Sequence, residues 1–184
     1  MPDPAVNIVG VGNVLMGDDG VGVAAVEALA RRALPEGVRL HDAGLAVGDV
    51  LGRLDPSDPL IVLDAVRGGG PPGSLYRLRP GAPAPGGRAA AGAVSLHELN
   101  VTAALQLEAL SGRVFVDVMV FGVEPDVIAW GEGLSPAASG AMDRLVGAVL
   151  RYVESRSAER RGRGVCGPTE SAKLIARKRG EPLR

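Results

Sequence analysis

The sequence has few of the features that would place the protein in a membrane or hold it together with covalent or metal cross-links. It contains one cysteine among 184 residues, so it can form neither an intrachain disulfide nor a multi-cysteine zinc site. No apolar run approaches the ~20 residues that span a bilayer, and the first residues lack the order of a signal peptide. These absences predict a cytoplasmic protein without membrane insertion.

Aromatic residues and net charge are also scarce. Aromatics make up 3% of the chain and glycines number 27, which predicts an aliphatic core with many tight turns. A formal net charge of -1 argues against a nucleic-acid partner. The charge is unevenly distributed, because residues 1–150 carry 10 basic and 17 acidic side chains and residues 151–184 carry 10 and 4. We therefore predict a domain over residues 1–154 and a basic, flexible tail over residues 155–184.

Strand-like and helix-like segments alternate along the domain. Apolar runs predict strands, and apolar residues repeating at helical spacing predict helices. Strands are expected at residues 7–12, 38–42, 60–65, 74–78, 114–123 and 127–130, and helices near residues 21–33, 47–54, 95–110 and 142–153. This order predicts an α/β fold: a three-layer, open, mainly parallel twisted sheet with helices on both faces and an antiparallel edge.

The segment before the third expected helix is rich in proline, glycine and alanine. We predict a mobile loop over residues 80–92. Ser95 and Glu98 then match a capping box, which marks the start of a helix. Its expected apolar face consists of Leu96, Leu99, Ala103, Leu107 and Leu110.

Acidic residues follow three of the expected strands, and a histidine begins a later helix. These residues are Asp18 and Asp19 after the first strand, Asp42 on the second, Asp64 on the third, and His97. Parallel strands present their carboxyl ends at one edge of a sheet, so we expect these side chains to converge there. Structural roles compete with this interpretation: one of the paired aspartates could cap a helix, Asp42 could orient a turn, and His97 could be a surface or capping residue.

Two kinds of binding site fit these residues. Gly10 and Gly12 after the first strand partly match a dinucleotide fingerprint, with Asp42 as the ribose-binding acid. Leu15 stands where a third glycine is needed, however, and two aspartates at the helix start would repel a phosphate, so no nucleotide is expected. Two carboxylates and one imidazole instead suit a divalent ion such as nickel, zinc or manganese.

The glycine-rich stretch of residues 10–22 closely resembles the opening signature of the hydrogenase maturation proteases. The resemblance continues through residues 60–65, 95–99 and 121–125, and covers about residues 5 to 153. It implies an endopeptidase that removes the C-terminal extension of a nickel-iron hydrogenase large-subunit precursor once nickel has been inserted. We expect it to act as a monomer.

The resemblance also implies roles for individual residues. Asp19, Asp64 and His97 match a metal-binding triad, and the metal is nickel supplied by the substrate. Asp42 matches another acid of the family and is a candidate for substrate binding. Residues 43–48 depart from the family's usual Gly-Gly-Thr type of turn, which bears on substrate choice.

The residues leave the mechanism open between two routes. A metal could polarise the scissile carbonyl or activate water, with a carboxylate as general base. Alternatively, Asp19 and Asp64 could act as an aspartic pair that shares a proton, which gives His97 no part. The chain has no Gly-x-Ser-x-Gly elbow, and Cys166 lies in the basic tail, so an acyl-enzyme is not expected. The rival hypothesis is a non-catalytic nucleotide- or metal-binding regulatory module of the same fold.

Overall fold

The computed structural model describes residues 5–80 and 98–163. The chain divides after Leu150 into two compact units. The sheet, most of the helices and the first part of the last helix belong to the first unit, Met1–Leu150. The second unit, which begins at Arg151, contains the rest of that helix, and the structure describes it to Arg163.

Five strands form a single sheet in the described residues. They are β1 (Val6–Val11), β2 (Val38–Gly44), β3 (Leu60–Ala65), β4 (Leu75–Leu78) and β5 (Val118–Val123). Their order across the sheet is β2-β1-β3-β5-β4. All neighbours run parallel except β4, which pairs antiparallel with β5 at the edge. The predicted mainly parallel sheet with an antiparallel edge is therefore confirmed.

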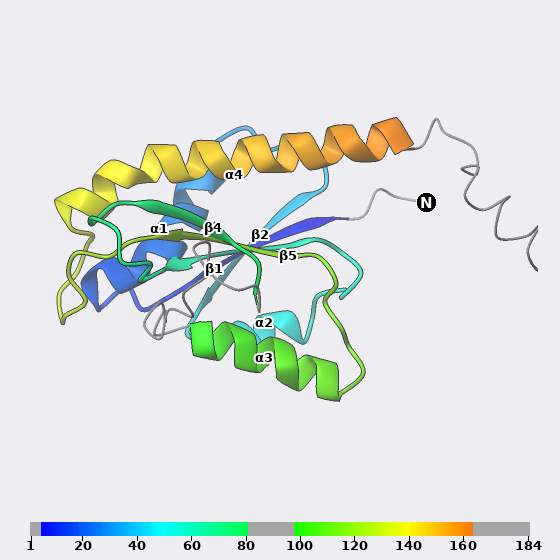
Figure 1. Cartoon of the computed structure of the whole chain (residues 1–184), viewed down its shortest axis with the longest axis horizontal. Coiled ribbons are helices and arrows are strands. Elements are labelled where there is room, and N and C mark those ends of the chain that lie inside the picture. Colours follow the sequence, from blue (N-terminus) through cyan, green and yellow to red (C-terminus); the bar gives the residue numbers. More distant parts are fainter. Residues whose placement is uncertain (1–4, 81–97, 164–184) are drawn as a thin grey trace, which may run out of the picture. The chain divides into compact units, whose positions relative to one another are not determined.

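Helices cover both faces of this sheet (Figure 1). They are α1 (Val21–Ala30), α2 (Val47–Leu51), α3 (Glu98–Leu110) and the part of α4 (Pro136–Arg163) that belongs to the first unit, residues 136–150. On one face, Arg32 after α1 pairs with Asp143 of α4 at 2.9 Å. On the other face, α2 packs against α3, and Arg113 joins them by donating to the carbonyls of Leu51 and Leu54. None of the helices among the described residues has the length and apolar character needed to cross a bilayer.

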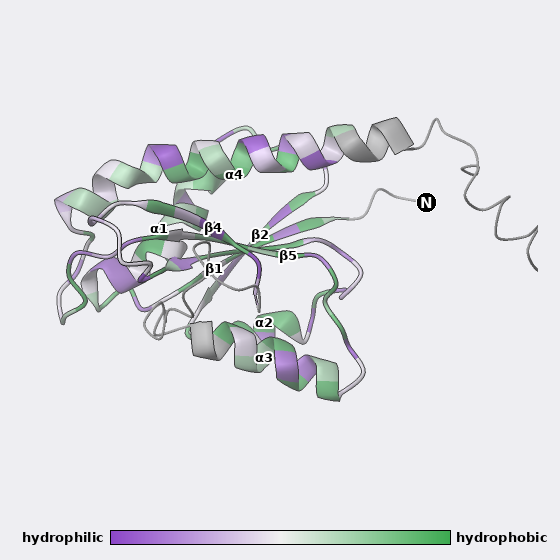
Figure 2. Cartoon of the chain, in the orientation of Figure 1, coloured by the Kyte–Doolittle hydropathy of each residue, from purple (hydrophilic) through white to green (hydrophobic). Residues whose placement is uncertain are grey.

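Alternating side chains of the central strands supply the core of each face. All six residues of β1 and all six of β3 are buried, as expected for strands covered on both sides. Figure 2 shows hydrophobic colouring along these strands and on α2. On the face of α2 and α3 the buried apolar cluster consists of Val9, Val11, Ala43, Val47, Leu51, Leu54, Leu60, Val62, Val101 and Val118.

The structure corrects two details of the predicted sheet. β5 begins at Val118 instead of residue 114, because Val114 and Val116 are exposed and only the later residues reach the sheet. Residues 127–130 form no strand. They lie in a loop that meets the sequence before α1 through one isolated bridge, between Met16 and Gly131.

Two helices also differ from their predicted form. α3 packs through Val101, Ala104 and Leu105, whereas Leu107 and Leu110 of the predicted apolar face are 65% and 86% exposed. The helix has two apolar faces. The one that packs against α2 contains Val101, Ala104 and Leu105, and it is not the face that the spacing of apolar residues predicted. α4 continues past residue 154 to Arg163, although its composition there is polar and basic.

Several predicted features lie outside the described residues. These are Ser95 of the capping box, nearly all of the proline- and glycine-rich loop of residues 80–92, the tail from residue 164, and His97. The capping box and, over residues 164–184, the flexible tail therefore stay predictions, whereas residues 155–163 of the predicted tail belong to α4.

Candidate functional site

The start of α1 rests directly on the carboxyl ends of β1 and β3. A Cβ atom at Gly22 would collide with the carbonyl oxygens of Val11 and Leu63, so only glycine permits this approach. The short 3-10 helix η1 (Gly17–Gly20), which carries Asp18 and Asp19, immediately precedes α1 and contacts β3. The structure thus brings the segments of Asp19 and Asp64 together at the end of the sheet formed by the carboxyl ends of its parallel strands, as the sequence predicts.

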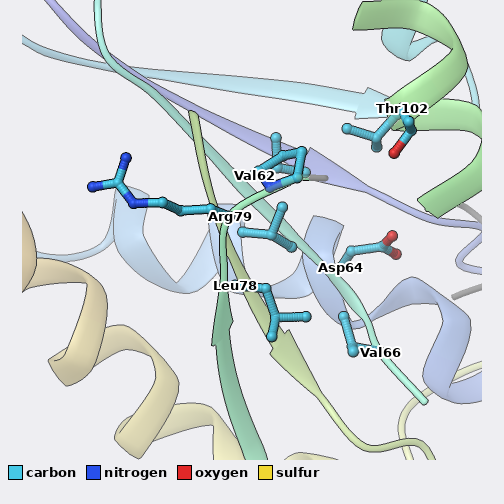
Figure 3. Close-up of a pocket in the computed structure, with 9 residues that line it drawn as sticks. Val62, Asp64, Val66, Leu78, Arg79 and Thr102 are labelled. Atoms are coloured by element: carbon cyan, nitrogen blue, oxygen red, sulfur yellow. The ribbon is translucent and has the colours of Figure 1, made fainter. Parts of the chain in front are cut away.

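Asp64 ends β3 and is 2% exposed. The amide of Ala65 donates a hydrogen bond to its Oδ1 at 2.7 Å. Asp64 lines a pocket together with Val62 of its own strand and with Val101 and Thr102 of α3. Figure 3 shows Asp64 and Thr102 on opposite sides of this space, while the guanidinium of Arg79 extends away from it. The buried carboxylate therefore faces the first turns of α3.

Asp19 lies in η1 and is 4% exposed. Its Oδ2 accepts a hydrogen bond from the amide of Asn13 at 3.0 Å. The side chain of Asn13 in turn accepts one from the amide of Leu15, which closes the turn after β1. Asp19 is thus a second buried carboxylate, held by the loop that leaves β1.

Asp18, the neighbour of Asp19, has a structural role that differs from the predicted helix cap. Neither η1 nor α1 has a side-chain cap. Instead, Asp18 accepts hydrogen bonds from the amides of Asp126, Val127 and Ser135 at 2.8, 3.1 and 2.7 Å, and from the Ser135 hydroxyl at 2.8 Å. Burial acts to raise the pKa of Asp18, but these hydrogen bonds outweigh it and lower the pKa below 3.8. Asp18 therefore ties the loop after β5 to the segment before α1.

Asp42 is exposed at the end of β2. Its Oδ1 accepts a hydrogen bond from the amide of Gly44 at 3.0 Å, and Gly44 has a φ of 48°. The turn-orienting role considered for Asp42 is therefore present. The carbonyl of Gly44 accepts a hydrogen bond from Gly12, which places this turn beside the loop after β1.

His41 is a structural residue of the sheet. Its Nε2 lies 2.9 Å from Oδ1 of Asn7 on the neighbouring strand β1. Burial, with a smaller contribution from Arg39, lowers the pKa of His41.

The third predicted ligand, His97, lies outside the described residues, so its position relative to the two aspartates stays a prediction. α3 begins at the next residue, Glu98. Within residues 5–80 and 98–163, no three His, Cys, Asp or Glu side chains group closely enough to hold a metal. The described part of the site supplies two carboxylates, which are ligands for a divalent ion only in combination with further donors.

Glu124 is a buried residue at the carboxyl end of the sheet for which the sequence predicted no role. It follows β5 and is 8% exposed. Its Oε2 accepts hydrogen bonds from the amides of Gly68 and Gly70 at 2.7 and 3.3 Å and from the hydroxyl of Tyr76 at 2.6 Å. Glu124 thereby fixes the glycine-rich turn that follows Asp64. An acid directly after an aliphatic strand was the available signal, the same signal that singled out Asp64.

Replacing Tyr76 by phenylalanine tests this network. Burial and the hydrogen bond to Glu124 raise the pKa of Tyr76 above 10.0, because both favour the neutral phenol. We expect Tyr76→Phe to lower the free energy of unfolding at pH 7 by about 1 kcal/mol. A raised pKa means that this contribution is complete below pH 10 and disappears as the pH rises through the folded-state pKa. In an ultraviolet titration, the tyrosine with the higher pKa should therefore be missing from the variant. If the missing tyrosine instead has an ordinary pKa, the hydrogen bond is not formed.

Comparison with known proteins decides the family. The model of the hydrogenase maturation protease family matches residues 23–152. The chain belongs to the hydrogenase maturation protease family. The match includes Asp64 and the sequence position of His97, and Asp19 precedes it by four residues. Family membership makes the chain a peptidase of hydrogenase maturation and favours this over a non-catalytic binding module.

Relatives across bacteria agree with this family. The chain is 34% identical to the hydrogenase expression/formation protein HupD of Rhodobacter capsulatus over 151 residues, which cover 80% of the chain and 70% of the relative. It is 30% identical to the hydrogenase 2 maturation protease of Escherichia coli K12 over 155 residues, covering 83% and 92%.

Solved structures show the same fold. The hydrogenase maturating endopeptidase HybD from E. coli has a TM-score of 0.70 at 29% identity, covering 83% of the chain and 93% of that protein. The [NiFe] hydrogenase maturation protease HybD from Thermococcus kodakarensis has a TM-score of 0.65 at 22% identity, covering 80% and 98%, and supports the fold.

Proposed function

We propose that this hydrogenase maturation protease removes the C-terminal extension of a nickel-iron hydrogenase large-subunit precursor after nickel insertion. In this proposal Asp19, Asp64 and His97 recognise the nickel ion that the precursor carries. The observation that carries the proposal is that two aspartates, Asp19 in η1 and Asp64 near the end of β3, are both buried in segments that contact each other. The family and its relatives supply the reaction class.

The donor set fits a metal that arrives with the substrate. Two aspartates and one histidine provide an oxygen, oxygen and nitrogen set that suits nickel. Three protein ligands leave positions for groups of the substrate, whereas a closed structural site would use four. Asp64 faces the first turns of α3, and His97 directly precedes that helix in the sequence, which supports His97 as the third ligand.

For the chemistry we propose the metal-assisted route over the aspartic one. It uses all three side chains, whereas an aspartic pair leaves His97 without a part. The precursor's nickel would polarise the scissile carbonyl, and one of the two carboxylates would take the proton of the attacking water. Asp42, at the turn beside the loop after β1, is proposed to contact the substrate.

Cleavage of nickel-loaded and nickel-free precursor tests the proposal. We expect the purified protein to convert only the loaded precursor to the shorter form, because the metal completes the recognition site. Mass spectrometry of both mixtures, with a nickel chelator added to a third, measures the product directly. Equal cleavage of both precursors, or no cleavage of the loaded one, would contradict nickel recognition.

A further inference from the structure

Four apolar side chains are exposed beside the proposed site. They are Val14 and Leu15 in the loop after β1, and Val127 and Trp130 in the loop after β5, with exposures of 50%, 44%, 50% and 80%. We call this set the apolar rim. Trp130 is the single tryptophan of the chain. Burying such side chains from water is favourable, so a group of them on the surface is typical of a binding site.

The two loops of the apolar rim lie side by side, although about 110 residues separate them in the sequence. Gly17 donates to the carbonyl of Gly131 at 3.1 Å, and Gly131 donates to the carbonyl of Leu15 at 3.0 Å. The amide of Asp18 also donates to the carbonyl of Val127 at 3.0 Å. On the left of Figure 1, the yellow-green segment after β5 runs beside the blue segment before α1. The backbones of the two loops that carry the rim are therefore joined.

Hydrogen bonds to the buried Asp18 hold this surface in place. The four bonds that Asp18 accepts fix the loop after β5 at both of its ends, at residues 126–127 and at Ser135. The hydroxyl of Ser135 also accepts from the amide of Ala138, which anchors the loop to the start of α4. A surface that is already ordered loses little conformational entropy on binding, which favours tight docking.

The charged side chains within the two loops of the apolar rim have one sign. Asp126 and Glu132 are exposed on either side of Val127 and Trp130. Residues 13–20 and 124–135 contain no lysine or arginine. The surface therefore complements a polypeptide segment that carries apolar side chains flanked by basic ones.

We propose that the apolar rim docks the precursor polypeptide through such a segment, close to the bond that is cut. The inference rests on the proposed function and adds the protein–protein contact that places the substrate. Leu15 lies four residues before Asp19, in the loop whose Asn13 amide donates to the Asp19 carboxylate, so a chain on the rim is delivered to the site. A second copy of this protein on the same surface would cover that edge of the sheet and block the substrate.

Fluorescence and cleavage together test the docking surface. The probe is the large-subunit precursor from the same genome, both nickel-loaded and nickel-free. Adding either form is expected to shift the emission of Trp130 to shorter wavelength, because its indole becomes buried. Trp130→Ser and Val127→Ser are each expected to raise KM for the loaded precursor about tenfold and to change kcat less than about twofold. Leu110→Ser, which removes an equally exposed apolar side chain from α3, should leave both constants unchanged.

The outcomes separate this inference from the proposed function. Binding with the emission shift but without cleavage would refute the proposed protease reaction and retain the docking surface. Cleavage with unchanged Trp130 emission, or with wild-type KM in both serine variants, would overturn the docking surface alone. Analytical ultracentrifugation tests the alternative occupant of the rim, a second copy of this protein. A dimer that dissociates in Trp130→Ser would assign the rim to that second copy and overturn the proposal. Absence of both binding and cleavage would refute both.

Discussion

Asp19→Asn is expected to stop processing of the precursor while leaving the fold intact. Asparagine has the same shape and can keep the hydrogen bond from the amide of Asn13 with its carbonyl oxygen. It lacks the negative charge that a metal ligand or general base needs, so we expect cleavage to fall about a thousandfold or more. Time courses with the nickel-loaded precursor measure the loss, and circular dichroism and thermal unfolding check the fold.

Two companion variants extend this experiment to the rest of the proposed triad. Asp64→Asn can keep the bond from Ala65 and should behave like Asp19→Asn, and His97→Ala should lose activity to a similar extent. Glu36→Gln changes an exposed acid before β2, outside the triad and the apolar rim, and should keep kcat within about twofold. Any triad variant that retains wild-type cleavage removes its residue from the site.

Asp18→Asn, at the adjacent residue, is expected to have the opposite phenotype and destabilise the protein. Both oxygens of Asp18 accept hydrogen bonds, so an asparagine must turn its amide group toward a backbone or hydroxyl donor. Loss of these charge-assisted bonds in a buried position should lower the free energy of unfolding by about 3 kcal/mol at pH 7. Urea unfolding of both proteins measures the difference.

The pH dependence of this difference identifies its cause. Burial raises the pKa of Asp18, but the hydrogen bonds lower it more, so the native state binds fewer protons than the unfolded state. The contribution is therefore complete above pH 3.8 and is lost as the pH falls through the lower folded-state pKa. A difference that stays constant from pH 7 to well below pH 3.8 would rule out the ionised carboxylate as the cause. Glu36→Gln, measured alongside, should unfold like the wild type.

The sequence predicted the sheet well because buried parallel strands have a distinctive pattern. The continuous aliphatic runs of β1 and β3 are covered on both faces, so they lack the alternation of a half-exposed strand. Residues 127–130 have a similar short apolar pattern but form a loop. Val127 and Trp130 in this loop are exposed on the surface and do not contribute to the core. A short apolar run alone does not distinguish these two cases.

The roles of the two adjacent aspartates could not be separated from the sequence. Asp18 and Asp19 have the same chemistry and nearly the same burial. What distinguishes them is contact with residues 126–135, more than 100 positions away, which local spacing does not encode. The resemblance to the family selected Asp19 for the site, and the structure independently gives Asp18 a structural role.

Both lateral edges of the sheet carry exposed positive charge. Arg39 lies on β2 at one edge and Arg77 on β4 at the other, and no further strand of the described residues pairs with either. Adding a strand beside them would crowd and desolvate a guanidinium group, which disfavours fibril growth and peptide capture by sheet extension. Under the proposed function, this leaves the carboxyl end of the sheet, where Asp19 of η1 and Asp64 of β3 lie, as the place where a substrate chain binds. Under the proposed function, the protein can therefore bind the C-terminal extension of its substrate without adding that segment to its sheet as a further strand.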